Sequence, residues 1–461
     1  MVRNVESVSS GRILPVLFLG VLMAALDIAI VGPALPALRE HYELSERAVS
    51  WVFNVFVLCN LLGLPLMARL SDVVGRRRIY ALDVALFAAG SLIVAGAPPF
   101  EVLLIGRGLQ GLGASGVFPV ASAVVGDVVP PARRGRALGI LGAVFGLAFI
   151  VGPILAGILL MAGWQWLFLI NIPLALVVIT FGLRVLPDGR AAEGGRLDWP
   201  GIVSLGSMLA LFAYGINRID TAAFLSSLAS SDVAPYLIGS ILLVPLFVRM
   251  EGRAANPLVR LELFRKRQVA IVAALGIGAG LTEAAFVFMP AMAVQAFSVT
   301  KSTASFMLLP LVSAVAVGSP VAGRTLDRLG SRAVILASTT LLTIGLAVMG
   351  LMSLTITTFY VASVLIGLGL SGILGSSLSY ILLHESEAAE RTVAQGIGTL
   401  SISIGQLTGG ALIGAVITSA AAGLGGYQAA FTVIAMVGAA LVVTSVFLKR
   451  RSVEIGRTAE A

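Results

Sequence analysis

The chain has 461 residues, of which 58% are hydrophobic and 12% are charged, and its formal net charge is +8. The surface of a soluble protein needs far more charge, so this composition excludes a soluble domain and predicts an integral membrane protein. The single Cys excludes a disulfide framework and a Cys-based metal site, while His41 and His384 lie far apart in different loops. We therefore expect no metal and no cofactor.

Apolar runs follow one another along the chain. A spanning helix needs about 20 mostly apolar residues, because the hydrocarbon core is about 30 Å thick and lipid offers no partner to free backbone groups. The first run is longer than a signal-peptide core, so we expect it to be a retained span. Fourteen runs qualify, at about 13–37, 50–70, 79–97, 101–125, 137–161, 165–186, 200–217, 233–249, 268–292, 303–324, 332–354, 357–382, 393–419 and 427–448.

The basic residues indicate how these helices are oriented. With a cytoplasmic N-terminus, 26 of the 31 Lys and Arg residues fall in cytoplasmic segments and 4 in outer loops, and Arg107 lies within a span. Positive charge favours the cytoplasmic side, so we expect a multi-pass protein of the cell (inner) membrane with both termini in the cytoplasm. A single span among the weak runs 200–217 and 233–249 would invert the second half, so we expect both to span. Basic loops of this kind argue against a nucleic-acid partner.

A short motif occurs twice. ARLSDVVGRRR at 68–78 and GRTLDRLGSR at 323–332 share Arg, Asp, Gly and Arg, at Arg69/Arg324, Asp72/Asp327, Gly75/Gly330 and Arg77/Arg332. Each copy follows the second run of a six-run block, which indicates a duplicated membrane unit. The alternative is a pair of basic turns that only orient the helices. We expect an all-α fold of two pseudo-symmetric six-helix bundles, at 1–190 and 263–461, with a two-helix insertion at 191–262.

Charges inside spans are functional candidates, because they are costly in lipid. Asp27 lies midway along the first run without a basic neighbour in its own helix, and burial disfavours the ionised carboxylate. We therefore expect it to take up and release a proton; the alternative is a structural acid at a helix contact. Asp83, about one turn inside the third run, is expected to pair with the arginines at 76–78 and to be structural.

Arg107 lies in the fourth run, in RGLQGLG, and a guanidinium cannot lose its charge. It is expected to lower the proton affinity of a nearby acid, with Gln110 on the same face; the alternative is a static ion pair between helices. The glycines around it are expected to clear space for its side chain. They are Gly106, Gly108, Gly111 and Gly113.

Glu283 lies in the ninth run, in GLTEAAFVFMPAM, which the repeat makes the counterpart of the first run. We expect it to be a second proton-coupling acid; the alternative is a single structural acid. Neighbouring aromatic and Met side chains would suit an adaptable apolar ligand surface, or could equally face lipid. They are Phe286, Phe288, Met289 and Met292.

The fifth run, GAVFGLAFIVGPILAG, is rich in glycine. Small residues allow membrane helices to approach closely, and proline bends them. This pattern predicts a tight, pliable helix contact at Gly142, Gly146, Gly152, Pro153 and Gly157.

Taken together, ARLSDVVGRRR, RGLQGLG, GLAFIVGPILAG and LDIAIVGPALP resemble the motifs of the major facilitator superfamily. WQWLFLINIP at 164–173 and the six-two-six layout resemble its fourteen-span drug:proton antiporter branch. The resemblance implies alternating access between two bundles, proton coupling at Asp27, Arg107 in a cavity charge network and an antiporter hinge at Gly152–Pro153. It also implies a cytoplasmic gate at the repeated motif, formed by Asp72, Gly75, Arg76, Arg77, Asp327, Gly330 and Arg332.

We therefore expect a proton-coupled multidrug efflux antiporter that exports lipophilic compounds, with cations as one candidate class. The alternative is an exporter of a lipid or native metabolite with the same fold. A membrane enzyme would need a nucleophile with a base or a metal cluster inside the spans, which the sequence does not show. The expected partners are the substrate, protons and the bilayer, and the expected state is a monomer.

Overall fold

The structure is a computed structural model that describes residues 10–97, 99–129, 141, 144, 147–148, 150–187, 198–220, 222–254, 261–385, 391–419 and 423–449. Twelve helices within these residues are long and apolar enough to cross a membrane, and they coincide with twelve of the fourteen expected spans. The other two expected spans coincide with shorter apolar helices, Ile150–Leu159 and Ile356–Gly372. The second of these, α16, is followed by a π-helical turn (Ile373–Ser377) and α17 (Leu378–Glu385), so its apolar run is not one regular helix.

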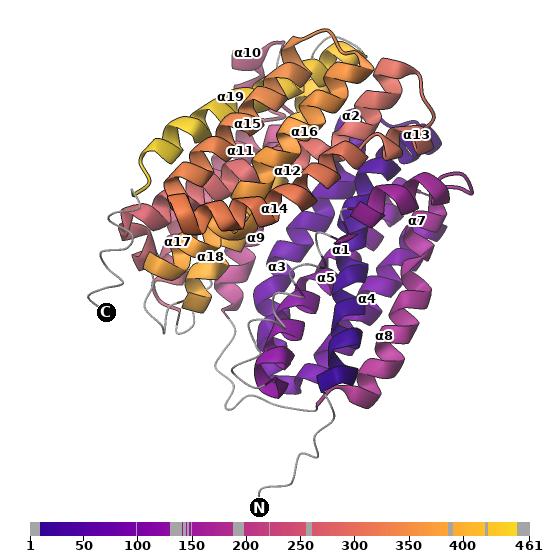
Figure 1. The fold of residues 1–461 in the computed structure, drawn as a ribbon, viewed down its shortest axis with the longest axis vertical. Helices are drawn as coiled ribbons and strands as arrows, with labels where there is room; N and C mark the ends of the chain where they lie inside the picture. The colour runs from indigo at the N-terminus through magenta and orange to yellow at the C-terminus, as the bar shows by residue number, and fades with distance from the viewer. Residues whose placement is uncertain are drawn as a thin grey trace, which may run out of the picture. The chain divides into compact units, whose positions relative to one another are not determined.

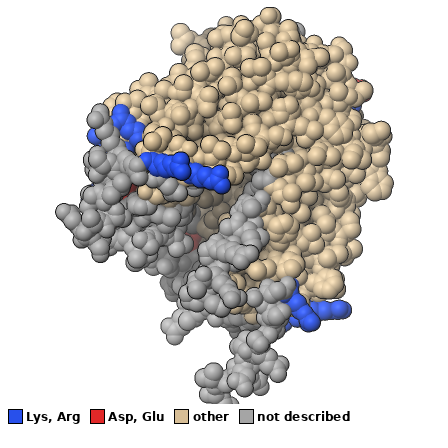
Figure 2. Space-filling model, viewed as in Figure 1, with Lys and Arg blue, Asp and Glu red and all other residues tan. Residues whose placement is uncertain are grey.

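Contacts between residues divide the chain into two compact units. Unit 1 comprises residues 1–34 and 55–197, and unit 2 comprises residues 35–54 and 198–461. Figure 1 shows the long helices of each unit. Figure 2 shows that most of the described surface in that view carries neither basic nor acidic side chains, as expected for helices that face lipid.

Unit 1 contains most of α1 (Ser10–His41) and α3 (Trp51–Val74), together with α4 (Arg76–Gly96), α5 (Phe100–Val128), residues 150–159, α7 (Gln165–Leu169) and α8 (Asn171–Val185). Helix α4 is central to this unit and packs against α5, α7 and α8. Its contact with α5 is close because glycines meet there: a Cβ at Gly106 would lie 2.9 Å from the Gly90 carbonyl oxygen, and one at Gly113 would lie 2.5 Å from the Asp83 carbonyl oxygen.

Unit 2 contains α2 (Glu46–Val49), α9 (Trp199–Asn217), α10 (Phe224–Leu228), α11 (Ala234–Glu251), a 3-10 turn (Leu261–Arg265), α12 (Arg267–Phe297), α13 (Lys301–Phe306), α14 (Leu309–Leu329), α15 (Ser331–Leu351), α16, α17, α18 (Arg391–Ser419) and α19 (Leu424–Val446). Its closest helix pair is α12 with α18. A Cβ at Gly280 would lie 2.9 Å from the Gln406 nitrogen, and one at Gly405 would lie 2.8 Å from the Leu281 nitrogen.

The middle pair of helices, α9 and α11, packs as a hairpin. The Ser240 hydroxyl donates to the Met208 carbonyl at 2.9 Å, and a Cβ at Gly215 would lie 2.8 Å from Leu237. At the end of α9, the buried Asn217 accepts the indole N–H of Trp51 at 3.0 Å and donates to the Ala411 carbonyl at 3.3 Å. The pair is therefore attached to the start of α3 and to α18 within unit 2.

The repeated motif forms the same backbone turn in each unit. Gly75 separates α3 from α4 with φ 114°, and Gly330 separates α14 from α15 with φ 83°. The amide of Gly75 donates to the Ser71 carbonyl at 3.2 Å, and that of Gly330 donates to the equivalent Leu326 carbonyl at 2.9 Å. Positive φ favours glycine because a Cβ would clash with the backbone, which explains why both copies keep Gly here.

Candidate functional site

A buried ion pair joins α1 to α5 in unit 1. The Arg107 Nη1 donates to the Asp27 Oδ2 at 2.7 Å, and both side chains are 0% exposed. Asp27 has no basic neighbour within its own turn of α1, so the compensating charge comes from a residue 80 positions away. The two charges compensate each other in a buried region, where either charge without its partner would carry a large desolvation free energy.

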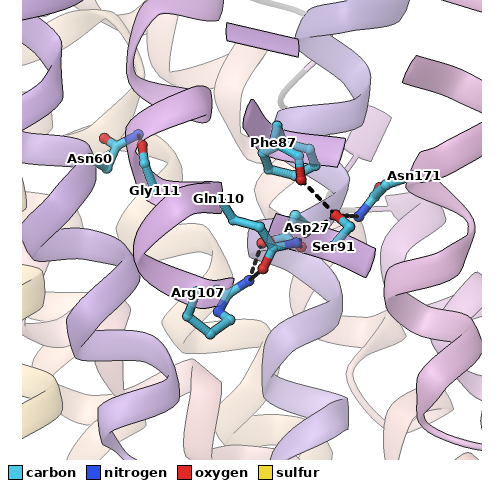
Figure 3. Close-up of polar contacts among 8 residues, drawn as sticks. All are labelled: Asp27, Asn60, Phe87, Ser91, Arg107, Gln110, Gly111 and Asn171. Atoms are coloured by element: carbon cyan, nitrogen blue, oxygen red, sulfur yellow. Dashed lines mark hydrogen bonds and ion pairs between the residues drawn. The ribbon is translucent and has the colours of Figure 1, made fainter. Parts of the chain in front are cut away.

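Gln110 extends this pair into a network (Figure 3). Its carbonyl accepts from Arg107 at 2.7 Å, and its amide donates to the Asp27 Oδ1 at 3.2 Å and to the Ser91 hydroxyl at 2.7 Å. Asn171 also donates to the Ser91 hydroxyl at 3.2 Å, so four helices, α1, α4, α5 and α8, meet in these contacts. The sequence predicts Gln110 on the same face as Arg107, whereas Ser91 could not be predicted because one Ser in a helix gives no signal.

Aromatic rings surround the guanidinium. Phe56 lies 4.4 Å from the Arg107 Cζ and Phe168 lies 5.9 Å from it, measured to the ring centroids, which is favourable for a cation on a ring face. The glycines expected to clear space for Arg107 lie at helix contacts. Gly106 and Gly113 contact α4, while Gly108 and Gly111 contact α3, so these glycines allow the helices to approach.

Glu283 lies in α12 of unit 2, partly exposed, and is hydrogen-bonded by Gln406 of α18. Phe286, one turn further along α12, is also partly exposed. The expected ligand surface is otherwise wrong, because Phe288, Met289 and Met292 are buried in the packing of the unit. Glu283 and Phe286 are thus the residues of this group that remain accessible.

The repeated motif, which was expected to form a cytoplasmic gate, is described in part. Arg76 is buried and its Nε lies 2.7 Å from a carboxylate oxygen of Asp127, an ion pair between α4 and α5. Arg77 and Arg332 are partly exposed. The side chains of Asp72 and Asp327 lie outside the described part of the structure.

The glycine-rich fifth run is also described in part. Gly152 is buried against α1, where a Cβ would lie 2.5 Å from the Ala29 Cβ, and the neighbouring Pro153 and Gly157 are buried as well. Gly142 and Gly146 lie outside the described residues. The described part of this helix therefore touches α1 two residues from Asp27.

Asp83 differs from its expected role. It is 0% exposed, and neither carboxylate oxygen has a hydrogen-bond partner among the described residues. The expected pairing with the arginines at 76–78 is wrong, since Arg76 pairs with Asp127 and Asp83 forms no ion pair in the described structure.

A second polar cluster, which sequence analysis missed, joins α1 and α2 to the later helices of unit 2. The buried carboxylate of Glu46 accepts from Arg39 at 2.5 Å and from the Tyr427 hydroxyl, and Lys301 pairs with Glu40 at 2.5 Å. A cavity of about 400 Å³ lies beside it. Its lining is Pro36, Arg39, Glu40, Glu43, Leu44, Ala291, Val294, Gln295 and Lys301.

We expect Tyr427→Phe to destabilise the protein by about 1.5–3 kcal/mol, because a buried hydrogen bond to a charged group is lost. Thermal unfolding in detergent measures this effect. Tyr360→Phe is the matched control, since Tyr360 is 36% exposed. Equal unfolding temperatures for the two variants would show that the Tyr427 hydroxyl contributes nothing.

Groups of three or more His, Cys, Asp or Glu side chains that could hold a metal ion do not occur among the described residues. The polar clusters of the two units instead pair acids with donors from neighbouring helices.

The fold and these buried charges define a multi-spanning helical membrane protein built on a repeated helix–glycine–helix unit. The sequence matches the Major Facilitator Superfamily model over residues 17–405 and, in a second match, over residues 281–461. The chain therefore belongs to the major facilitator superfamily, which confirms the resemblance of its motifs. It is a transporter and not an enzyme.

Curated relatives cover most of the chain. It is 33% identical over 390 residues to YfiU of Bacillus subtilis strain 168, an uncharacterized MFS-type transporter, covering 83% of this chain and 75% of YfiU. It is 30% identical over 416 residues to the multidrug resistance protein Stp of Mycobacterium tuberculosis, covering 87% of this chain and 74% of Stp.

A solved structure supports the fold. The crystal structure of the nucleoside transporter NupG aligns with a TM-score of 0.66 over 95% of this chain and 99% of NupG. At 12% identity, this likeness concerns the fold alone.

Proposed function

We propose that this transporter is a proton-coupled multidrug efflux antiporter of the cell membrane that exports lipophilic, cationic compounds by alternating access. It belongs, in this proposal, to the fourteen-span branch of its family and acts as a monomer with both termini in the cytoplasm. Residues 1–190 and 263–461 form the two bundles, and residues 191–262 form the inserted pair. The relatives named for multidrug resistance support the substrate class.

The observation that carries the proposal is the buried Asp27–Arg107 pair. A proton that binds Asp27 converts the pair into a neutral acid beside a guanidinium that keeps its charge. Arg107 cannot release its own charge, so protonation disfavours this arrangement of α1 and α5 relative to one in which Arg107 finds another partner or water. Proton binding is thereby linked to conformation.

Glu283 supplies a second acid, in the other unit. It is partly exposed and shares its face of α12 with Phe286, which suits an acid that meets a lipophilic cation. In an antiporter the proton and the substrate compete: the cation binds where the carboxylate is ionised, and a proton then displaces it. We propose Glu283, Asp27 or both as the point of this exchange.

Proton release on addition of substrate tests the proposal. Purified protein in weak buffer is mixed with tetraphenylphosphonium and other lipophilic cations while the pH is followed. We expect the wild type to release protons, and we expect Asp27→Asn or Glu283→Gln to abolish the release at the acid where exchange occurs. Glu101→Gln, an exposed acid at the start of α5, is the control that keeps the signal.

The result also separates the alternative function. No release from folded wild-type protein with any of the cations would overturn export of cationic drugs. Release on addition of a neutral lipid or a native metabolite, but not of the cations, would assign the transporter to the alternative substrate class.

A further inference from the structure

Asp83 is a buried acid that the Asp27 network does not use. It lies seven residues beyond the start of α4 and is 0% exposed, and neither of its carboxylate oxygens has a hydrogen-bond partner in the described part of the chain. Buried polar groups are nearly always hydrogen-bonded, and acids inside spans mark functional sites, so this carboxyl calls for an explanation.

Helix α5 covers the carboxyl. A Cβ at Gly116 would lie 2.5 Å from the Asp83 Cγ and 2.6 Å from its Oδ1, so only glycine leaves room for the acid. One turn earlier, Gly113 meets the backbone of Asp83 and Phe87. Arg107 and Gln110 belong to the same helix, so a movement of α5 away from α4 would disturb the Asp27 network and uncover Asp83 together.

The charged groups on the helices packed against α4 and on α1 either pair with other residues or are exposed. Tyr80, on α4 itself, is the titratable group that interacts electrostatically with Asp83, and its hydroxyl donates to the Leu17 carbonyl at 3.2 Å. Helix α7 carries no charge. The remaining titratable groups of α1, α5 and α8 are the Asp27–Arg107 pair, Asp127 on Arg76, and the exposed Arg12, Arg39, Glu40, His41, Glu101 and Arg184.

An ionised carboxylate in this position would have no compensating charge and no donor among the described residues. Burying such an ion is strongly unfavourable, so the arrangement favours the neutral, protonated acid. Asp27, in contrast, lies 2.7 Å from the permanent cation of Arg107. Unit 1 therefore holds one acid paired with a cation and another without a hydrogen-bond partner among the described residues.

Asp83 lies on the face of α4 that the Asp27 network contacts. Asp83, Phe87 and Ser91 are spaced four residues apart on one face of α4, and Ser91 accepts from Gln110 of the Asp27 network. Eight residues of helix place Asp83 about 12 Å from Ser91, toward the Arg76 end of α4. Phe87, the residue between them on this face, is buried.

We propose that Asp83 is a second proton-carrying residue of unit 1, which holds a proton while α5 covers it and releases that proton toward the Arg76 end of α4 when α5 moves. In this step the O–H bond of Asp83 breaks, the proton passes to water, and a carboxylate remains; nothing is oxidised or reduced. The inference rests on the proposed proton coupling, and it adds one proton to each transport cycle.

The number of protons per substrate tests this inference. In vesicles with the membrane potential clamped at zero, each coupled proton contributes about a factor of ten per pH unit to the limiting gradient of tetraphenylphosphonium. We expect Asp83→Asn to lower that limit about tenfold at a gradient of one pH unit. Glu101→Gln should keep the wild-type limit. An unchanged limit in Asp83→Asn would overturn the inference.

Infrared difference spectroscopy tests the same residue without transport. Spectra of purified protein at low and high pH should show the carbonyl stretch of a protonated acid that disappears as the pH rises and is absent from Asp83→Asn. An identical band in wild type and variant would refute the role of Asp83. If the wild type transports no cation but this band responds to pH, the proposed drug export fails while the proton site at Asp83 stands.

Discussion

Asp27→Asn is expected to abolish substrate accumulation driven by a pH gradient and to destabilise the protein. The substitution leaves the Arg107 guanidinium, which is 0% exposed, without its carboxylate. Removing one partner of a buried ion pair costs about 3–5 kcal/mol, because the remaining charge stays buried. Contacts with Phe56 and Phe168 offset part of this penalty. Thermal unfolding in detergent and transport in vesicles measure the two effects.

A double variant distinguishes two roles of Asp27, the neutralisation of the Arg107 charge and the binding of a proton. Asp27→Asn combined with Arg107→Met removes both buried charges, so we expect it to be more stable than Asp27→Asn alone. Transport should remain absent in the double variant because Asp27, the acid whose protonation is proposed to be linked to the arrangement of α1 and α5, is missing. Recovery of transport would show that Asp27 serves only to neutralise Arg107, and a single Asp27→Asn variant as stable as the wild type would contradict the buried-pair argument.

Gly405→Ala is expected to have a large structural effect for a one-carbon change. A Cβ at this position of α18 would lie 2.8 Å from the Ile277 carbonyl carbon and 2.8 Å from the Leu281 nitrogen. Both are backbone atoms of α12, so the helices must separate to admit the methyl group. Overpacking of this kind typically costs about 1–3 kcal/mol. The next residue, Gln406, forms a side-chain hydrogen bond with Glu283, and the substitution should also weaken this hydrogen bond.

Gly396→Ala provides the matched control on the same helix. A Cβ at Gly396 would meet nothing within 4 Å, so the substitution should leave the unfolding temperature unchanged or slightly raised. Gel filtration and thermal unfolding in detergent compare the two variants. Similar unfolding temperatures would mean that α12 and α18 can separate at little cost, contrary to their close packing in the structure.

The sequence by itself was enough to define the class of protein. Hydropathy is a property of neighbouring residues, and a run of about 20 apolar residues has few ways to exist other than as a spanning helix. Twelve of the expected spans therefore coincide with long apolar helices. The repeat of Gly75 and Gly330 could also be recognised in the sequence. Both residues have a positive φ between two helices, a backbone conformation that favours glycine.

The sequence identified the candidate residues one by one but did not predict which residues they contact. Asp27, Arg107 and Glu283 stood out because a charge in a span is rare. That Asp27 meets Arg107, that Ser91 and Asn171 complete the network, and that Glu46 meets Tyr427 depend on helices 80 to 381 residues apart in the sequence. The periodicity of one helix gives no information about which face another helix presents to it.

Tertiary structure also reversed two local interpretations and added to a third. Asp83 follows the arginines at 76–78 by about one to two helical turns, so the sequence suggested an ion pair with them. In the structure α5 covers the Asp83 carboxyl and Arg76 pairs with Asp127. The glycines around Arg107 serve the approach of neighbouring helices, and Phe288, Met289 and Met292 are buried in the packing of their unit. Composition and spacing determined that this chain is a membrane protein with acids in its spans, and the resemblance of its motifs implied a transporter. Only the packing of one helix against another decided which acids are paired, which are buried without a partner among the described residues and which are partly exposed. The reason is that the environment of a side chain is set by contacts between segments that are distant in the chain.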